Sequence, residues 1–474
     1  MRLLFLLLLL TLHVPVVAQP FEAPAIPAAE SAFDRGLRAY ETGQYDAAAR
    51  AFRKVTEGAF NQRTTAAHLM LGKAHYAAGE FADAIGAMTD FVREYPRSRY
   101  LADARALRIE SQARLDAAEA VPEATDVGVV LPTNNADIVF SQALFNGVRL
   151  AVEAHNAAVP ERPVRMVFRN TEGSERGAVQ AVESLSRAGV ELVLGPLYSE
   201  EATAAGGVAE RERLLLVAPL ATNEAVSEGR RYVFQANPTY AERGRAMARY
   251  AAAQRPGTFG VVAQSGTIGE TMAEAFQTEL IQVGGTVAFT ELLFDDRAWF
   301  RLDELLADSL NNLLADVDAL YLPVSGADAD EYAAGALRSL DRAVPPEERG
   351  RLRVFGNLEW GMLDASRPRA EGYGTVFTSD FHLGERDEDA RAFAERYRAL
   401  AGVAPERLAY AGYDLAQMVL ALLAERRSEE SLPDLLRRAA PYAGLGHRID
   451  FGRGNANEAM FILGYRDGEV VVVE

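Results

Sequence analysis

The chain has 474 residues, of which 49% are hydrophobic, so it is long enough for two or three folded domains with real cores. Its formal net charge is −18 at pH 7, and this charge would repel nucleic acids and anionic membrane surfaces, which are therefore not expected partners. It contains no cysteine, which excludes disulfides, a thiol nucleophile and a lipidated N-terminal cysteine.

The N-terminus has the pattern of a cleaved secretory signal, residues 1–18. One arginine, Arg2, precedes an apolar run over residues 3–12, and small residues end the segment at Ala18. The run is short for a bilayer span and Pro15 interrupts it, so a signal anchor is the weaker interpretation. We expect cleavage after Ala18 and a mature protein that is periplasmic or otherwise secreted, with no membrane span.

A Pro- and Ala-rich stretch, residues 19–30, is expected to be a linker, and residues 31–120 are expected to be purely helical. In the helical part, apolar residues recur at intervals of three and four. Two segments, GLRAYETGQYDAAARAF and GKAHYAAGEFADAIGAM, start at Gly36 and Gly72 and match each other. They resemble the tetratricopeptide repeat in their small residues, turn glycine and aromatic residue. Because such arrays need about three units, the helix over residues 101–115 is expected to cap the stack.

After Pro122 the pattern changes to short Val- and Leu-rich runs separated by amphipathic helical stretches. This alternation is typical of parallel sheets covered by helices on both faces. Two sets of runs, separated near Asn237 and Pro238, predict two doubly wound lobes, and the fold class is therefore α/β with an all-α domain in front. The predicted strands are 126–132, 164–170, 190–196, 213–219, 259–265, 319–325 and 352–357, helices follow at 386–401 and 408–425, and strands are expected from residue 447 onward.

No catalytic signature is present in the sequence. It has no G-x-S-x-G elbow, no phosphate loop ending in G-K-S/T and no H-E-x-x-H motif. His68 and His75 lie seven residues apart on a repeat helix, but surface histidines are much commoner than metal sites at this spacing. Acidic runs such as GERDEDARAF are typical of solvated helix faces. We therefore expect no enzymatic activity, no cofactor and no metal site.

Polar residues at three predicted strand ends favour a binding site for a small molecule. Ser199, Thr222 and Glu359 each follow a predicted strand, and in open parallel sheets ligands bind beyond these strand ends. The two hydroxyls, with backbone N–H groups such as that of Leu220, suit a carboxylate, and Glu359 suits an ammonium. Each residue alone would also fit a helix cap, a turn or a solvated surface. Their coincidence predicts a site for a zwitterion.

The order of motifs over residues 125–473 resembles the type I periplasmic binding proteins, specifically the branched-chain amino-acid-binding group. It implies a lobe 1 of about 125–236 and 381–444 and a lobe 2 of about 240–372 and 447–474. It also implies three crossovers, near 236–239, 373–380 and 444–447, and closure of the lobes around the ligand. The motifs that carry the resemblance are VGVVLP, ALFNGVRLAVEAHNA, FRNTEGSERGAVQAVESL, VLGPLYSEEA, APLATNEAVSEG, YVFQANPT, FRLDELLADSL, RAFAERYRALAG, AYAGYDLAQMVLAL and RIDFGRGNANEAMFILGYRDGEVV.

The resemblance also assigns roles to residues around the expected ligand. It implies that Ser199, Thr222 and the backbone near Leu220 receive the ligand's α-carboxylate, and that Glu359 pairs with its ammonium. Four further candidates depart from the family's pattern or adjoin these anchors. Asn134 lies in a loop without the usual glycines, Ile268 replaces a frequent aromatic, and Tyr198 and Trp360 would narrow the pocket. A branched-chain amino acid is therefore only the family default.

Two functions remain open from the sequence. The first is an extracytoplasmic substrate-binding protein for an amino acid or similar small zwitterion, serving ABC-type transport, with the repeats binding another envelope protein. The second is a non-transport scaffold or regulator of cell-wall (penicillin-binding) enzymes. Helical repeats ahead of this fold resemble the outer-membrane lipoproteins that activate those enzymes, although the lipidated cysteine is missing here. A concave repeat surface suits a protein or peptide partner, and a bare structural extension is its alternative.

Overall fold

The computed structural model describes residues 23–118, 124–134, 137–254, 257–308, 311–384, 387–427 and 430–473. The expected signal peptide and the first part of the expected linker lie outside these residues. The chain divides into two compact units, Met1–Leu101 and Ala102–Glu474. Within the described ranges, no helix combines the length and apolar character that crossing a bilayer requires.

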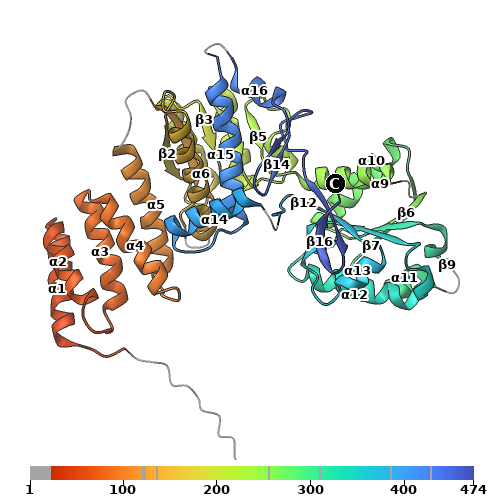
Figure 1. Ribbon diagram of the computed structural model, residues 1–474, viewed down its shortest axis with the longest axis horizontal. Coiled ribbons are helices and arrows are strands. Elements are labelled where there is room, and N and C mark those ends of the chain that lie inside the picture. The colour runs from red at the N-terminus through yellow and green to blue at the C-terminus, as the bar shows by residue number, and fades with distance from the viewer. Residues whose placement is uncertain are drawn as a thin grey trace, which may run out of the picture. The chain divides into compact units, whose positions relative to one another are not determined.

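Close helix contacts at glycine build the first unit, which Figure 1 shows in red and orange. A Cβ at Gly36 would lie 2.5 Å from the ring of Phe52, and one at Gly72 would lie 2.4 Å from Met88. These glycines occupy matching positions of the two repeat segments. Helix α1 begins at Pro27, so the end of the expected linker is helical, and proline is well tolerated in a first turn. The helices are α1 (Pro27–Glu41), α2 (Tyr45–Thr56), α3 (Thr64–Ala78) and α4 (Phe81–Glu94).

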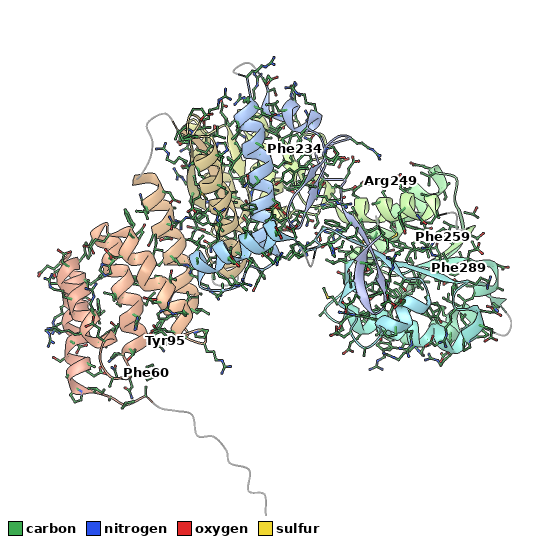
Figure 2. All side chains as sticks on the ribbon, in the orientation of Figure 1. Phe60, Tyr95, Phe234, Arg249, Phe259 and Phe289 are labelled. Carbon is green, nitrogen blue, oxygen red and sulfur yellow. The ribbon has the colours of Figure 1, made fainter. Side chains whose placement is uncertain are left out.

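Aromatic contacts add to the packing of the repeats. The rings of Phe60 and Tyr95 stack with 6.4 Å between centroids (Figure 2). The Tyr95 hydroxyl lies 3.3 Å from Nε2 of His68. His68 is therefore part of an aromatic cluster, and burial lowers its pKa.

Helix α5 (Leu101–Ala118) belongs with the α/β unit rather than with the repeats, which corrects the expectation of a capping helix. Its Ile109 is buried in the core of the first lobe. Arg108 is also buried and donates a hydrogen bond to the carbonyl of Ala401 at 3.1 Å, and burial lowers its pKa to about 10. Gln112 accepts a hydrogen bond from Arg149 of helix α6 (Ile138–Ala158). The apolar side chains of α5 thus complete the core of lobe 1.

Lobe 1 contains a parallel five-stranded sheet in the order β2-β1-β3-β4-β5. Helices α6 and α15 pack closely because a Cβ at Gly147 would lie 2.0 Å from the carbonyl oxygen of Ala409, and one at Gly412 would lie 2.2 Å from that of Leu144. The strands are β1 (Thr125–Leu131), β2 (Val164–Asn170), β3 (Leu192–Leu194), β4 (Leu215–Ala218) and β5 (Val233–Gln235), and the helices are α6 (Ile138–Ala158), α7 (Glu175–Arg187), α8 (Ser199–Glu212), η1 (Glu224–Val226), α14 (Glu388–Ala401), α15 (Arg407–Glu425) and α16 (Leu432–Arg438), with a hairpin of β13 (Tyr442–Ala443) and β14 (Arg448–Ile449).

Lobe 2 contains a seven-stranded sheet in the order β16-β15-β12-β11-β10-β6-β7, in which β15 and β16 are antiparallel to their neighbours. Phe289 of β7, labelled in Figure 2, covers Gly260 of β6. A Cβ at Gly260 would lie 2.2 Å from the Phe289 ring. The strands are β6 (Thr258–Gln264), β7 (Thr286–Leu293), β8 (Ala307–Asp308), β9 (Asn311–Asn312), β10 (Ala319–Tyr321), β11 (Arg353–Gly356), β12 (Val376–Ser379), β15 (Phe461–Arg466) and β16 (Glu469–Val472), and the helices are α9 (Tyr240–Ala253), α10 (Ile268–Gln282), η2 (Asp296–Arg301), α11 (Leu302–Leu306), η3 (Leu313–Asp316), α12 (Ala329–Ala343), η4 (Pro346–Glu348), η5 (Leu358–Met362) and α13 (Arg367–Gly372).

The two sheets share one winding pattern. The parallel strands run β2-β1-β3-β4-β5 in lobe 1 and β7-β6-β10-β11-β12 in lobe 2, so the first two strands of each set exchange places in the same way. This order has one switch point per sheet, where loops diverge and ligands are commonly bound. The predicted fold class is confirmed: two doubly wound lobes follow a helical repeat domain in the sequence.

The crossovers, the segments in which the chain passes from one lobe to the other, are called passages below. Two of the three lie close to the expected ranges. The first runs through residues 236–239, between β5 and α9, and the second follows β12 and starts at Asp380.

The third passage lies later than residues 444–447, which corrects both that prediction and the lobe boundaries. Asp414 of α15 accepts hydrogen bonds from the backbone N–H groups of Leu445, Gly446 and His447 at 2.7, 3.0 and 3.0 Å, and so holds this segment on lobe 1. The N–H of Asn457 still pairs with Gln235 of β5 at 2.8 Å. The chain therefore enters lobe 2 only after Asn457.

Candidate ligand-binding site at the strand ends

In lobe 1 the structure brings Ser199 and Thr222 together. Oγ of Ser199, the first residue of α8, accepts the backbone N–H groups of Thr222 at 3.1 Å and of Asn223 at 3.2 Å. The backbone N–H of Thr222 therefore already has a partner within the protein. The donors that remain for the carboxylate of a ligand are the hydroxyl groups of Ser199 and Thr222.

The loop before Ser199 depends on glycine. Gly195 has φ +112°, and a Cβ there would lie 2.0 Å from the carbonyl oxygen of Val130 on β1. Only glycine accepts both the dihedral angle and the close approach. This fixes the turn from which Tyr198 and Ser199 project.

Tyr198 and Asn134 are both partnered locally. The Tyr198 hydroxyl donates a hydrogen bond to Asp137 at 2.9 Å, and burial together with this bond raises its pKa. Oδ1 of Asn134 accepts the backbone N–H of Asp137, also at 2.9 Å. Asp137 was not predicted from the sequence as a partner of these residues, although its place just before α6 is that of a helix-capping residue. The carbonyl of Leu220 accepts a hydrogen bond from the side-chain amide of Asn237 at 3.3 Å.

Glu359 lies in η5, directly after β11, and is partly buried. Burial raises the pKa of its carboxyl, while the positive charges of Arg243 and Arg407 oppose this rise. These two guanidinium groups are cations already near the carboxylate. A ligand ammonium would have to compete with them.

The expectation that Trp360 lines the pocket is wrong, because this side chain is fully buried in the core of lobe 2. Its indole N–H donates to the carbonyl of Leu322 at 2.8 Å. The ring lies over Gly356, where a Cβ would come within 2.2 Å of it. Ile268, the first residue of α10, is partly buried against the neighbouring core.

Three polar residues of lobe 2 were not among the site residues predicted from the sequence. The side-chain oxygens of Tyr321, Ser325 and Asn357 are buried, and each lacks a hydrogen-bond partner among the described residues. All three lie at or just beyond the carboxyl ends of β10 and β11. Ser325 closes the predicted run ALYLPVS, so its position after a strand was the available signal.

A cavity lies elsewhere, away from the predicted ligand-binding residues. It has a volume of about 600 Å³ and is lined by Arg249 and Tyr250 of α9 and by residues such as Tyr442, Arg448 and Met460. Arg249 is labelled in Figure 2. None of the predicted ligand-binding residues lines it. Arg249 is already paired with Glu242 and Glu279.

Among the described residues, one cluster of histidine and carboxylate groups could reach a common metal ion: His75, Glu80 and Asp83 on the repeats. Nδ1 of His75 already contacts Glu80 at 2.5 Å, and Nε2 lies 3.3 Å from the guanidinium of Arg53. An adjacent arginine repels a cation, so this arrangement suits an ion pair better than a metal site.

Two family models match the sequence. Residues 125–293 match the periplasmic binding protein model, and residues 33–99 match the tetratricopeptide repeat model. Both resemblances inferred from the motifs are confirmed over these residues. A search of curated proteins found no match.

Solved structures share the fold of the α/β unit. A crystal structure titled as a putative branched-chain amino acid ABC transporter from Rhodospirillum rubrum is 24% identical, with a TM-score of 0.61, and covers 74% of this chain and 100% of its own. An ABC transporter substrate-binding protein from Desulfitobacterium hafniense in complex with Leu is 19% identical, with a TM-score of 0.54 and coverages of 74% and 100%. A solute-binding protein from Rhodopseudomonas palustris BisB5 with 3,4-dihydroxybenzoic acid is 15% identical, with a TM-score of 0.51 and coverages of 73% and 95%.

Proposed function

We propose that this chain is an extracytoplasmic substrate-binding protein that captures an amino acid or similar small zwitterion between its two lobes and serves ABC-type transport. The observation that carries the proposal is the pair of identically wound sheets joined by three passages, with polar residues at the strand ends of both. Such strand ends are where open parallel sheets bind ligands. The match of residues 125–293 to the periplasmic binding proteins supports the same function.

The ligand's two charged groups would contact opposite lobes. The hydroxyls of Ser199 and Thr222 donate to its carboxylate in lobe 1, and Glu359 accepts from its ammonium in lobe 2. In lobe 2, the side-chain oxygens of Tyr321, Ser325 and Asn357 lie at the neighbouring strand ends and have no hydrogen-bond partner in the part of the chain that the structure describes. Leucine and 3,4-dihydroxybenzoic acid, each bound to one of the similar structures, both carry a carboxylate. The carboxylate is therefore the group to keep constant in a screen.

A thermal-shift screen of the full mature chain tests the proposal. Amino acids and small aromatic carboxylates should include at least one compound that raises the melting temperature, because a ligand that binds only the folded state stabilises it. Calorimetric titration of that compound should then show affinity about tenfold to a hundredfold weaker for Thr222→Val and for Glu359→Gln. Thr222→Val removes the hydroxyl but keeps the side-chain shape and the amide contact to Ser199.

Thr278→Val, on the exposed face of α10, is the matched control and should leave affinity unchanged. Absence of any stabilising compound, or unchanged affinity in Thr222→Val and Glu359→Gln, would contradict this assignment.

The location proposed for the protein has its own test. Sequencing the N-terminus of the exported protein should show cleavage after Ala18. A retained N-terminal segment would contradict the signal peptide without affecting the binding assignment.

A second candidate is a scaffold or regulator of cell-wall enzymes that contacts them through the repeats. Two observations favour it: the repeat match over residues 33–99, and the use of the Thr222 amide and the Ser199 oxygen within the protein. Capture from envelope extracts with the full chain should recover a cell-wall synthase in this case. Recovery of a permease alone would exclude it.

A further inference from the structure

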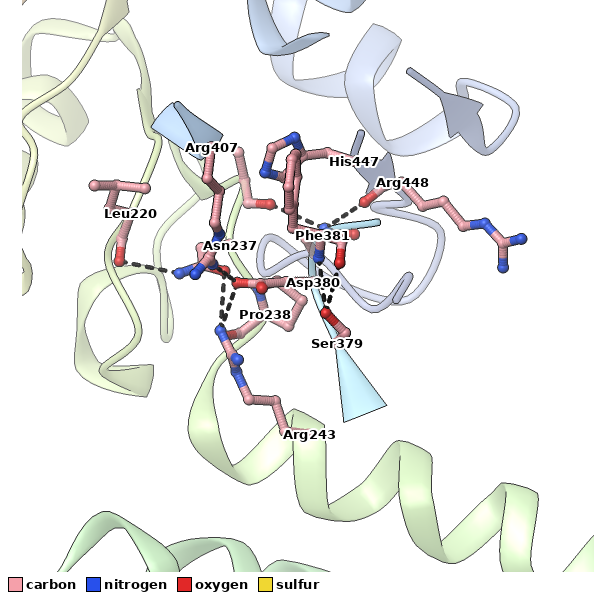
Figure 3. Close-up of polar contacts among 12 residues, drawn as sticks. Leu220, Asn237, Pro238, Arg243, Ser379, Asp380, Phe381, Arg407, His447 and Arg448 are labelled. Atoms are coloured by element: carbon pink, nitrogen blue, oxygen red, sulfur yellow. Dashed lines mark hydrogen bonds and ion pairs between the residues drawn. The ribbon is translucent and has the colours of Figure 1, made fainter. Parts of the chain in front are cut away.

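A buried ion cluster lies where the lobes join. Asp380 follows β12 on the second passage and is only 5% exposed. Its Oδ2 accepts a hydrogen bond from Arg243 of α9 at 2.8 Å and another from Arg407, the first residue of α15. Figure 3 shows both guanidinium groups at this carboxylate. Because α9 belongs to lobe 2 and α15 to lobe 1, one carboxylate oxygen joins the two lobes.

The helices that carry the two arginines are fixed within their own lobes. A Cβ at Gly244 of α9 would lie 2.2 Å from the carbonyl oxygen of Met272 on α10. On α15, a Cβ at Gly412 would lie 2.2 Å from the carbonyl oxygen of Leu144 on α6. Packing this close leaves little room for either helix to shift alone. Movement of one lobe against the other must therefore change the geometry at Asp380.

The cluster also includes the first passage. The guanidinium of Arg243 donates to Oδ1 of Asn237 at 3.1 Å and to the carbonyl of Pro238 at 3.4 Å (Figure 3). Asn237 in turn donates to Leu220 of lobe 1. Arg243 thus connects two passages, and its side chain is only 9% exposed.

The small cavity beside the cluster is not a ligand pocket. Its lining includes Leu220, Asn237, Asp380, Arg407 and His447, and its volume is about 20 Å³. A volume of this size holds about one water molecule, which excludes an amino acid. The charged groups therefore act on each other and on the passages rather than on a ligand.

We propose that Arg243, Asp380 and Arg407 form an interlobe lock that holds the lobes in their present arrangement and sets the free energy of moving away from it. The inference deepens the proposed function, since lobe movement is how such a receptor would capture its ligand. It rests on the two-lobed architecture, and it can be tested without any ligand. A charge-assisted hydrogen bond shared by two lobes favours the arrangement in which both donors reach the carboxylate.

Because the chain has no cysteine, spin labels can be placed at two introduced sites only. Glu212→Cys on α8 and Ile281→Cys on α10 are exposed positions in lobe 1 and lobe 2. Pulsed electron resonance then measures the distance between lobes in the full ligand-free chain. Arg407→Gln should broaden or shift the distance distribution, with a change of about tenfold in the ratio of lobe arrangements. Arg407→Lys keeps the charge and should restore part of the wild-type distribution.

Arg342→Gln is the control, because Arg342 pairs with Asp303 at 2.6 Å entirely within lobe 2. It should leave the distribution unchanged. Arg407 is 37% exposed, so its replacement is compatible with folding, which the circular dichroism spectrum checks. A distribution identical to wild type in folded Arg407→Gln would overturn the lock. A chain that bound no compound in the thermal-shift screen could still show the lock, so the two proposals fail separately.

Discussion

The carboxyl edges of the two sheets have the same winding order but treat their polar groups differently. In lobe 1, Ser199 accepts two backbone N–H groups and Tyr198 donates to Asp137. In lobe 2, the oxygens of Tyr321 and Ser325 are buried without a protein partner among the described residues. Paired groups hold a loop in one shape, whereas buried unpaired groups cost free energy. The edge of lobe 1 is therefore built to stay fixed, and that of lobe 2 keeps capacity for further hydrogen bonds.

The largest effect is expected from Trp360→Ala, which removes the buried side chain beneath the edge of lobe 2. A cavity of this size should lower the free energy of unfolding by about 3–5 kcal/mol, as measured by urea denaturation. Trp360→Phe keeps most of the volume but loses the hydrogen bond to Leu322, so its cost should be smaller. Equal stability of Trp360→Ala and wild type would contradict the burial described for lobe 2.

Asp380→Asn should change the pH dependence of stability. Burial alone would raise the pKa of Asp380, but the charges of Arg243 and Arg407 outweigh it and hold the pKa below its usual value. The carboxylate therefore stabilises the fold above the unfolded-state pKa of about 3.9, and this contribution is lost as the pH falls through the folded-state pKa. At pH 7 the wild type should be more stable than Asp380→Asn by about 1.5–3 kcal/mol.

Melting temperatures measured from pH 7 down to pH 3 check this prediction. The gap between wild type and Asp380→Asn should stay constant in the upper part of the range and narrow below about pH 4. A gap that widened with acid would show that the charge of Asp380 does not stabilise the fold.

Ser199→Ala and Ser325→Ala compare the two edges directly. Ser199→Ala leaves the N–H groups of Thr222 and Asn223 without their acceptor and should cost about 1–2 kcal/mol in urea denaturation. Ser325→Ala removes a hydroxyl that has no partner among the residues described, and its stability should stay within about 0.5 kcal/mol of wild type. The opposite ranking would reverse the distinction between the lobes.

Tyr321→Phe is expected to have a small effect, and a favourable one. The Tyr321 ring stacks on Phe276 with 4.1 Å between centroids, and this contact survives the change. The buried Tyr321 hydroxyl has no partner within the described ranges, so its loss should leave stability unchanged or raise it by up to about 1 kcal/mol, seen as a higher melting temperature. Clear destabilisation would reveal a hydrogen bond of the hydroxyl within the folded protein.

Most of the fold was predictable because local patterns determine it. Val- and Leu-rich runs bounded by Pro, Gly or Asn predicted most of the parallel strands but missed β5, β7 and β12. The glycine and aromatic spacing predicted the repeats. The third passage was misplaced because it depends on Asp414, which on sequence alone is one carboxylate in an amphipathic helix. Only the fold shows that this carboxylate binds three N–H groups of a segment more than thirty residues later.

The candidate site was predictable only in part. Position after a strand identified Ser199 and Thr222, and the structure places them in contact. Position after a strand does not predict that the Trp360 side chain packs over Gly356 in the core, because this packing depends on the space that the missing Cβ of Gly356 leaves. Nor could it find the lock, because Arg243, Asp380 and Arg407 come from distant segments and each resembles an ordinary surface charge in the sequence.

Helix α5 has a consequence for how the two kinds of domain can be exchanged between proteins. Its side chains form part of the core of lobe 1, so the smallest transplantable α/β module starts near Ala102 rather than at the first strand. A recombination event that cut the gene just before β1 would deliver a lobe with an open core. A domain boundary that keeps the core of lobe 1 intact therefore lies at the N-terminal end of helix α5.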